Sequence, residues 1–147
     1  MPVPISLRKA SATDAEFLLS LAREAYREVL TRQFTGWDES VHGHRFSEKI
    51  AAFPFQIAEL DGEPVAAFSS SVHSDHVRVN ELVVLPAFQN RGLGSQLLVR
   101  VLDSARSIGL PVRLYTFRLN RAAQFYLRHG FIVAGRRGEF IDMEWSG

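Results

Sequence analysis

The pattern of hydrophobic and polar residues predicts strands and helices that follow one another along the chain. Its clearest part is the unbroken apolar run from Leu82 to Leu85, which Pro86 ends. Such a run is typical of a strand that is covered on both faces. Residues 93–108 then carry apolar side chains at helical spacing, so we expect a helix with one buried face directly after this strand.

The N-terminal part alternates between strand and helix signals. Residues 5–9 alternate apolar and polar side chains, as a half-buried strand does. Thr13 and Glu16 have the spacing of a capping box, which predicts the start of a helix, and we expect a second helix after Asp38. The pair Asp61-Gly62 separates two strand-like runs, residues 55–60 and 64–72, and predicts the turn of a β-hairpin.

The C-terminal part predicts three more strands around a short helix. Residues 112–117 form the first strand, Asn120 is a suitable helix N-cap, and Gly130 suits the end of that helix. Residues 131–133 and 139–144 are expected to pair, with the turn around Gly135 and Gly138. The order of elements predicts an α/β fold, with a mixed central β-sheet flanked by helices, and one domain over residues 1–147.

Composition narrows the classes of function. The 147 residues carry a formal net charge of +1 and no block of Lys or Arg, so we expect no nucleic acid and no membrane surface as a partner. There are no cysteines, which excludes disulfides, thiolate metal sites and a cysteine nucleophile. No apolar run approaches about 18 residues, the length of a membrane span. A cytoplasmic monomer or homodimer is expected.

The turn between the central strand and the long helix has the chemistry of an anion site. The first N–H groups of a helix lack intrahelical partners, and the helix dipole makes this end partly positive. Gly92 and Gly94 keep side chains away from these N–H groups, and Arg91 adds a positive charge. The alternative is a tight turn whose glycines serve only backbone geometry. A dinucleotide fingerprint would need a third glycine where Leu97 stands, and a P-loop would need Lys and Ser or Thr after its last glycine.

Two segments resemble one family. The pattern Leu82-x-Val84-x-Pro86-x-x-Gln89-x-x-Gly92-x-Gly94 resembles the acetyl-CoA-binding signature of the GCN5-related N-acetyltransferases. Residues 122–131 resemble the later helix of that family, with its tyrosine and its terminal Gly-Phe. The resemblance covers residues 55–135. It implies the fold of that family and acetyl-CoA as co-substrate, without a metal.

The resemblance also implies a set of site residues. Tyr126 takes the position of the general acid, although it also suits packing against Phe131. Asn120 precedes Tyr126 by one residue fewer than in the family, so it is either a cofactor ligand or only a helix cap. The implied cofactor-binding residues are Leu82, Val83, Val84, Gln89, Asn90, Arg91, Gly92, Leu93, Gly94, Ser95 and Asn120.

The group that accepts the amine proton is less well defined by the sequence. Glu81, at the start of the central strand, is the leading candidate for the general base, and a salt-bridged carboxylate at a strand end is the alternative. A chain of water molecules, His73 and His76 are further options. Some members of the family carry a glutamate on the following strand, where this chain has Tyr115.

The segment after the first helix mixes aromatic and histidine residues. Phe34 and Trp37 are candidates for a substrate-facing wall, and ordinary packing against the sheet is the alternative. The pairs His42-x-His44 and His73-x-x-His76 have no acidic or cysteine cluster beside them, so we expect no metal site there.

The expected function is transfer of an acetyl group from acetyl-CoA to a primary amine, of a small molecule or a protein, by direct attack in a ternary complex. One alternative is a non-catalytic acyl-CoA-binding regulatory module, and another is a plain interaction domain. The sequence does not specify the acceptor.

Overall fold

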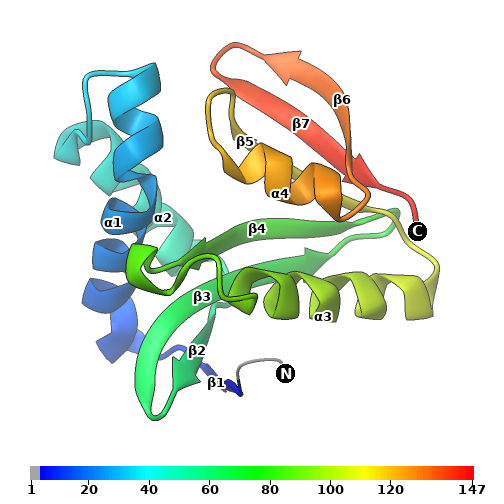
Figure 1. Cartoon of the computed structure of the whole chain (residues 1–147), viewed down its shortest axis with the longest axis horizontal. Coiled ribbons are helices and arrows are strands. Elements are labelled where there is room, and N and C mark those ends of the chain that lie inside the picture. The colour runs from blue at the N-terminus through cyan, green and yellow to red at the C-terminus, as the bar shows by residue number, and fades with distance from the viewer. Residues whose placement is uncertain (1–3) are drawn as a thin grey trace.

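The computed structural model describes residues 4–147 and contains one seven-stranded mixed sheet with the strand order β1-β2-β3-β4-β5-β7-β6 (Figure 1). The β4–β5 pair is parallel, and the other neighbours are antiparallel. The strands are β1 (Ser6–Lys9), β2 (Gln56–Leu60), β3 (Glu63–Val72), β4 (Val77–Val84), β5 (Val112–Phe117), β6 (Ile132–Arg137) and β7 (Phe140–Trp145).

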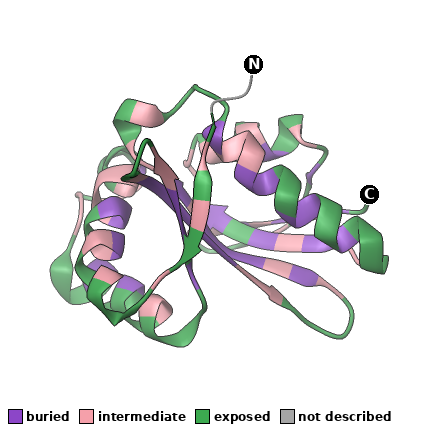
Figure 2. Cartoon of the chain, turned by 90° about the horizontal axis from the view of Figure 1, so that it is seen from below, coloured by how far each residue is buried: buried purple, intermediate pink, exposed green. Residues whose placement is uncertain are grey.

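Helices cover both faces of the sheet, which confirms the predicted α/β class. The helices are α1 (Ala15–Gln33), α2 (His44–Ala52), α3 (Leu93–Ile108) and α4 (Ala122–Arg128). The buried stripe of α3 faces β3 and β4, and its opposite side is exposed (Figure 2). None of the helices within residues 4–147 combines the length and the apolarity needed to cross a membrane.

The start of the first helix differs from the prediction. The capping contact is made two residues earlier than Thr13–Glu16, at a short 3-10 turn over Ala12–Asp14, where the Asp14 carboxylate accepts the Ser11 N–H at 2.8 Å. Arg8, on β1, donates two hydrogen bonds of 2.9 Å to the same carboxylate and so fixes it in place. This contact between two elements is not encoded in local spacing.

The first of the two closing strands is longer than predicted, and the second is shifted by one residue to Phe140–Trp145. β6 continues to Arg137, and the turn contains Gly138, whose φ is +57°. Gly135 does not belong to the turn, because it pairs with Asp142 inside the β6–β7 ladder. The register shifts between Val133 and Gly135, so a bulge accounts for the glycine in mid-strand.

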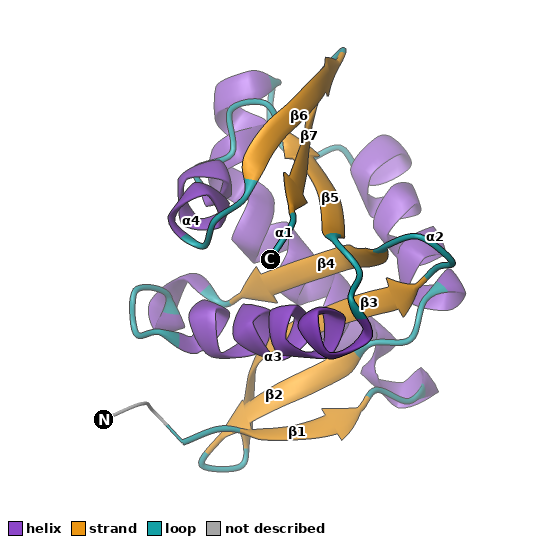
Figure 3. Ribbon diagram, turned by 90° about the vertical axis from the view of Figure 1, so that its right-hand side faces the viewer, coloured by secondary structure: helices purple, strands orange, loops and turns teal. Residues whose placement is uncertain are grey.

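Strands β4 and β5 pair only at their beginnings. Val77 pairs with Val112 and Arg78 with Arg113, and beyond these pairs the two strands diverge (Figure 3). The backbone edge of β4 that faces β5 therefore has no strand partner over most of its length. A wedge opens between an N-terminal half, strands β1 to β4, and a C-terminal half, strands β5, β7 and β6.

Helix α1 joins the two halves. Leu18 and Leu21 pack in a cluster with strands β2 to β4, whereas Leu30 packs with Phe117 of β5. At the end of α1, the Gln33 side chain donates to the Glu139 carbonyl at 2.7 Å and accepts the Leu119 N–H at 2.8 Å. The position of the C-terminal half is thus fixed at the open end of the wedge.

A bulge in β4 changes which face its residues occupy. Ser69 pairs with Glu81 and Ser70 pairs with Val79, so Asn80 is an extra residue. Val79 packs in the cluster under α3, whereas the Glu81 side chain lies on the α1 and α2 side. In a regular strand these two residues would share a face. The bulge therefore directs Glu81 away from the core beneath α3.

Candidate active site

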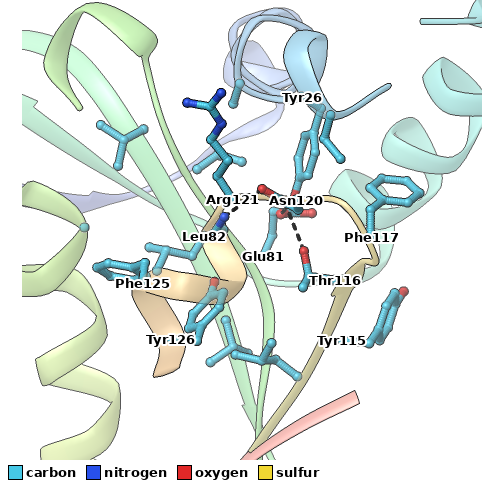
Figure 4. Close-up of a pocket in the computed structure, with 18 of the residues that line it drawn as sticks. Tyr26, Glu81, Leu82, Tyr115, Thr116, Phe117, Asn120, Arg121, Phe125 and Tyr126 are labelled. Carbon is cyan, nitrogen blue, oxygen red and sulfur yellow. Dashed lines mark hydrogen bonds between the residues drawn. The ribbon is translucent and has the colours of Figure 1, made fainter. Parts of the chain in front are cut away.

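The wedge contains a cavity of about 1310 Å³. Its walls come from β4 and β5, from the start of α3, from α4, and from one side of α1 and α2. Figure 4 shows residues from these separate elements around one space. The cavity has two regions of different construction.

The first region lies where α3 begins. Gly92 is the N-cap with a φ of +81°, and a Cβ added there would meet no atom within 4 Å. The N–H groups of Leu93, Gly94 and Ser95 form the first turn of α3 and have no intrahelical acceptor. An anion can therefore approach these N–H groups without meeting a side chain, as the sequence predicts.

The loop before α3 is held against the end of β4. The Gln89 side chain donates to the Val84 carbonyl at 3.0 Å, and Asn90 adopts a left-handed conformation with a φ of +64°. A Cβ added at Gly94 would lie 3.4 Å from the Phe125 ring, so α3 and α4 approach each other closely at this point. These contacts place the unpaired edge of β4 and the N-terminus of α3 along one line.

The second region surrounds a buried carboxylate. Glu81 is 6% exposed, and its two oxygens accept hydrogen bonds from different elements. The Tyr26 hydroxyl, from α1, donates to Oε1 (Figure 4). Lys49 Nζ, from α2, donates to Oε2 at 3.1 Å and to the Asn80 carbonyl at 3.2 Å.

Burial and the charge of Glu81 shift the pKa values of its two partners, Tyr26 and Lys49. Burial raises the pKa of Tyr26, and the Glu81 charge raises it further. Burial by itself lowers the pKa of Lys49, but Glu81 and Tyr115 together outweigh this and the net direction is upward. Tyr26 therefore stays a hydrogen-bond donor and Lys49 stays a cation at neutral pH.

Tyr126 reaches the same cavity from α4. Its ring is 6% exposed and packs edge-on against Phe131, with the centroids 5.4 Å apart. Burial raises the pKa of Tyr126, and the nearby Glu81 charge adds to this. Among residues 4–147, none forms a hydrogen bond with its hydroxyl. A protonated phenol without a protein partner thus faces the cavity.

Asn120 caps α4. Its Oδ1 accepts the Ala122 N–H at 2.9 Å, and its Nδ2 donates to Thr116 Oγ1 at 3.0 Å (Figure 4). The predicted capping role is confirmed. Contact with a cofactor remains a prediction for this residue.

Comparison with known proteins assigns the chain to a family. A sequence model described as an acetyltransferase (GNAT) domain matches residues 51–133, which is more than half of the 147 residues. The chain belongs to the GCN5-related N-acetyltransferase (GNAT) family. It is an acetyl-CoA-dependent N-acetyltransferase.

Individual GNAT relatives agree with this assignment. The chain is 28% identical over 139 residues to the aminoalkylphosphonate N-acetyltransferase of Salmonella typhimurium, covering 89% of this chain and 86% of that protein. The fold is similar to the PaiA N-acetyltransferase of Thermoplasma acidophilum in complex with coenzyme A, with a TM-score of 0.80, 22% identity, and coverage of 98% and 99% of the two chains. It is also similar to YjaB of Escherichia coli in its apo form, with a TM-score of 0.75, 18% identity and the same coverage.

The GNAT structure brings most of the predicted site residues to one cavity. The residues that line it are Glu81, Leu82, Val83, Val84, Gln89, Asn90, Gly92, Gly94, Ser95, Asn120 and Tyr126. Two predicted cofactor residues lie differently. The Leu93 side chain is buried in the core, which leaves only its N–H for a ligand, and the Arg91 guanidinium lies 5.2 Å from the centre of the Phe88 ring rather than in the cavity wall.

The two predicted acceptor contacts do not line this cavity. Phe34 packs edge-on against Phe117 at 5.6 Å, and Trp37 stacks on Phe46 at 5.7 Å. Phe46 and Phe117 themselves form part of the wall. Phe34 and Trp37 therefore support the wall from behind, and the alternative of ordinary packing describes them better.

Sequence reasoning missed the residues that surround Glu81. Tyr26 and Lys49 lie 55 and 32 positions away from it in the chain, so no local spacing links them. One compositional signal was available: Lys49 is one of only two lysines, whereas the other fifteen cations among Lys and Arg are arginines.

The histidine pairs lie outside the cavity. His42 Nδ1 accepts the Asp38 N–H at 2.9 Å, and His44 contacts Glu48 at 2.9 Å. His73 and His76 stack on each other with their centroids 4.6 Å apart. Within residues 4–147, neither pair belongs to a group of three or more ligands suited to a metal ion.

Proposed function

We propose that this enzyme transfers the acetyl group of acetyl-CoA to a primary amine by direct attack, with both substrates in the wedge at once. The observation that carries this proposal is the meeting of Tyr126 and Glu81 in one cavity whose other end is the open N-terminus of α3. The amine forms a bond to the acetyl carbon while the carbon–sulfur bond breaks, and the amine loses a proton as the thiolate gains one.

The first region fits coenzyme A. The N–H groups of Leu93, Gly94 and Ser95 would bind the pyrophosphate, since they are unpaired and the helix dipole favours an anion there. The free edge of β4 would hydrogen-bond to the pantetheine arm, in the manner of an added strand. An N–H of this edge would also stabilise charge that develops on the carbonyl oxygen during attack. The bound thioester supplies the activated acetyl group.

Tyr126 would assist the departing thiolate. A free thiol has a pKa of about 8.5 and a free tyrosine about 10, and burial raises the pKa of Tyr126 further. Complete proton transfer from this phenol is therefore uphill. A hydrogen bond from the hydroxyl to the developing thiolate fits the geometry better, because the hydroxyl has no partner in the described chain.

Glu81 would accept the proton of the amine, directly or through water. At pH 7 only about one alkylamine in 2,500 is neutral, because its pKa is near 10.4. A fixed carboxylate beside the acceptor lowers this barrier by drawing the proton away. Each oxygen of Glu81 has one hydrogen bond from the protein, which leaves lone pairs for an amine.

The class of acceptor is suggested by a relative of known name. The Salmonella relative is named for aminoalkylphosphonates, which are small primary amines, and we propose a small-molecule amine for this enzyme as well. A non-catalytic acyl-CoA-binding module would have the first region and no use for an unpaired phenol beside a buried carboxylate.

The test combines binding with turnover. Purified protein should be stabilised against heat by acetyl-CoA, and it should release free CoA thiol when supplied with a panel of small primary amines. Mass spectrometry should find one added acetyl group on the consumed amine. Stabilisation without thiol release over the whole panel would favour the binding module instead.

A further inference from the structure

Two opposite charges lie side by side in the second region of the cavity. Lys49 Nζ is 3.1 Å from Glu81 Oε2, and the two side chains are 24% and 5% exposed. Aromatic rings border the ammonium group, with the centroid of Tyr115 at 5.3 Å and that of Phe46 at 5.6 Å. This ion pair is therefore partly shielded from water and borders the space into which an acceptor must enter.

Part of the hydrogen-bonding capacity of the pair is unused. Lys49 donates to Glu81 and to the Asn80 carbonyl, and the Tyr115 hydroxyl is a further hydrogen-bond partner, so its three N–H donors are engaged. Glu81 accepts one bond at each oxygen, although each has two lone pairs. Glu81 can thus accept a ligand N–H without giving up a partner, whereas an anionic group at Lys49 would replace the neutral Tyr115 hydroxyl and keep the ion pair intact.

A simple alkylammonium ion suits this arrangement poorly. It would gain from Glu81, but it would lie within a few ångströms of the Lys49 ammonium, and like charges at that distance repel strongly where water is scarce. A ligand that carries one charge of each sign, a few bonds apart, would place an anionic group at Lys49 and its amine at Glu81. Each charge of the ligand would then face its opposite.

We propose that the acceptor is a compact zwitterion, a primary amine with a carboxylate or phosphonate two or three bonds away, and that Lys49 is the residue that selects for the anionic group. This inference rests on the proposed function, because it assumes that the amine reacts beside Glu81. It goes further because it assigns the anionic group of the acceptor to Lys49.

Three of the four other cations that line the cavity within residues 4–147 pair with carboxylates of the protein, among them Arg121 with Glu28 at 2.6 Å, and Arg128 of α4 is the exception. Arg45, one turn before Lys49 on α2, contacts Glu139 at 3.4 Å. Arg137 makes three hydrogen bonds of 2.8 to 3.1 Å to the two carboxylate oxygens of Asp142. Lys49 also differs in shape, since its ammonium is a compact charge that fits next to Glu81, whereas a guanidinium would span a wider area.

The first experiment measures binding to the CoA-loaded wild-type enzyme by calorimetry. Three ligands share an aminoethyl group and differ in what it carries: 2-aminoethylphosphonate a phosphonate, β-alanine a carboxylate and propylamine a methyl group. We expect both zwitterions to bind at least tenfold more tightly than propylamine, and their ratio tells phosphonate from carboxylate preference. Equal or tighter binding of propylamine would overturn the inference.

The second experiment tests whether Lys49 is responsible. In Lys49→Met the advantage of the zwitterions over propylamine should shrink to less than threefold, and in Lys49→Arg part of it should return. Arg45→Met is the matched control on the same helix face and should keep the wild-type ratio. Because each ratio is taken within one variant, damage to Glu81 affects all three ligands alike and cancels. An unchanged ratio in Lys49→Met would refute the assignment.

A wild-type measurement covers the case in which Lys49→Met does not fold. Propylphosphonate has the anionic group without the amine, and it should compete with the acceptor, while propanol at the same concentration should not. Failure of propylphosphonate to compete would count against the inference. Selective zwitterion binding without any release of CoA thiol from acetyl-CoA would instead refute the proposed function and leave the binding site in place.

Discussion

The two regions of the cavity are built in different ways. The coenzyme A region consists mainly of backbone: the N–H groups at the start of α3 and the free edge of β4. Its parts follow one another within residues 82–95. The acceptor region consists of side chains from four elements, namely Tyr26 of α1, Lys49 of α2, Glu81 of β4 and Tyr115 of β5. A backbone site requires little of the sequence beyond glycine, whereas a side-chain site requires residues that only folding brings together.

This difference explains how one framework can serve a constant co-substrate and a particular acceptor. The first region depends on backbone geometry that many sequences can adopt. The second can change through single substitutions on α1 or α2 without any effect on the helix terminus that we propose to bind the pyrophosphate. Variants in the two regions should accordingly affect different quantities, cofactor affinity in one and acceptor turnover in the other.

The largest effect is expected from Gly92→Leu, which places a side chain in the open space before α3 and requires a left-handed conformation. The dissociation constant of CoA should rise more than a hundredfold, or by at least about 2.8 kcal/mol. Gly109→Leu is the control, since Gly109 caps the other end of α3 with a φ of +71° and equally open surroundings. Both variants should melt at similarly reduced temperatures, because a left-handed non-glycine residue costs about 1–2 kcal/mol. Calorimetry that finds equal CoA affinity in the two variants would contradict a backbone anion site.

Glu81→Gln should leave CoA binding unchanged and lower kcat about a hundredfold at pH 7.5. The loss in kcat should become smaller as the pH approaches the pKa of the free amine, because more of the acceptor is then neutral without a general base. The substitution also leaves Lys49 without its ion-pair partner, so stability must be separated from rate. The double variant with Lys49→Met removes both charges and should regain stability while the rate stays low. A kcat within threefold of wild type for Glu81→Gln would assign proton removal to water.

Tyr126→Phe removes only the hydroxyl and keeps the packing against Phe131. We expect kcat to fall tenfold or more, with unchanged CoA affinity, because the hydrogen bond to the thiolate matters only during reaction. Steady-state kinetics with a fixed acceptor measures this change. Tyr26→Phe is the comparison, since its hydroxyl bonds to Glu81 and should affect the pH profile instead. Wild-type kcat in Tyr126→Phe would leave this residue with a packing role only.

Asn120→Ala should cost about 1 kcal/mol of unfolding free energy, as expected for the loss of a helix cap. CoA affinity should change less than threefold, because Oδ1 and Nδ2 of this amide both have protein partners. Asn120→Asp retains an oxygen for the Ala122 N–H and should recover most of the stability. Denaturant unfolding and calorimetry together decide the matter: weaker CoA binding at unchanged stability would show that Asn120 touches the cofactor.

The last effect is confined to alkaline pH. Burial raises the pKa of Tyr126 above its ordinary value of 10.0, so above pH 10 the folded chain holds a proton that the unfolded chain loses. The stability contributed by this group is complete below pH 10 and decreases as the pH rises toward the folded pKa. The unfolding free energy of Tyr126→Phe should therefore fall less steeply between pH 10 and 11.5, by at most about 1.4 kcal/mol per pH unit. Parallel curves for wild type and variant would contradict the raised pKa.

Elements with local signals were predictable from the sequence. Asp61 and Gly62 form the expected hairpin turn with φ angles of +52° and +81°, and Gly109 ends α3. The glycine turn before α3 and the position of Tyr126 on α4 also follow from short segments. Each of these features depends on residues that are neighbours in the chain.

Features that depend on distant contacts were not predictable in this way. The cap at Ser11 depends on Arg8 of β1, and Gly135 lies in a strand because a bulge displaces the turn. The surroundings of Glu81 come from α1 and α2, and the aromatic residues Phe34 and Trp37 gave no sign of which side they would face. Composition identifies such residues as candidates, but only the packing of the helices decides which of them reach the cavity.

The bridge from Gln33 to Glu139 and Leu119 has a consequence for how the reactants meet. Since β4 and β5 separate after two residue pairs, the width of the wedge depends on contacts such as this one at the far end of α1, together with the packing of Leu30 on Phe117. In the proposed reaction the thioester lies along one half and Tyr126 belongs to the other, so Gln33 would act as a spacer between them. A residue outside the cavity would thereby help to set the distance between the thioester on β4 and the Tyr126 hydroxyl on α4.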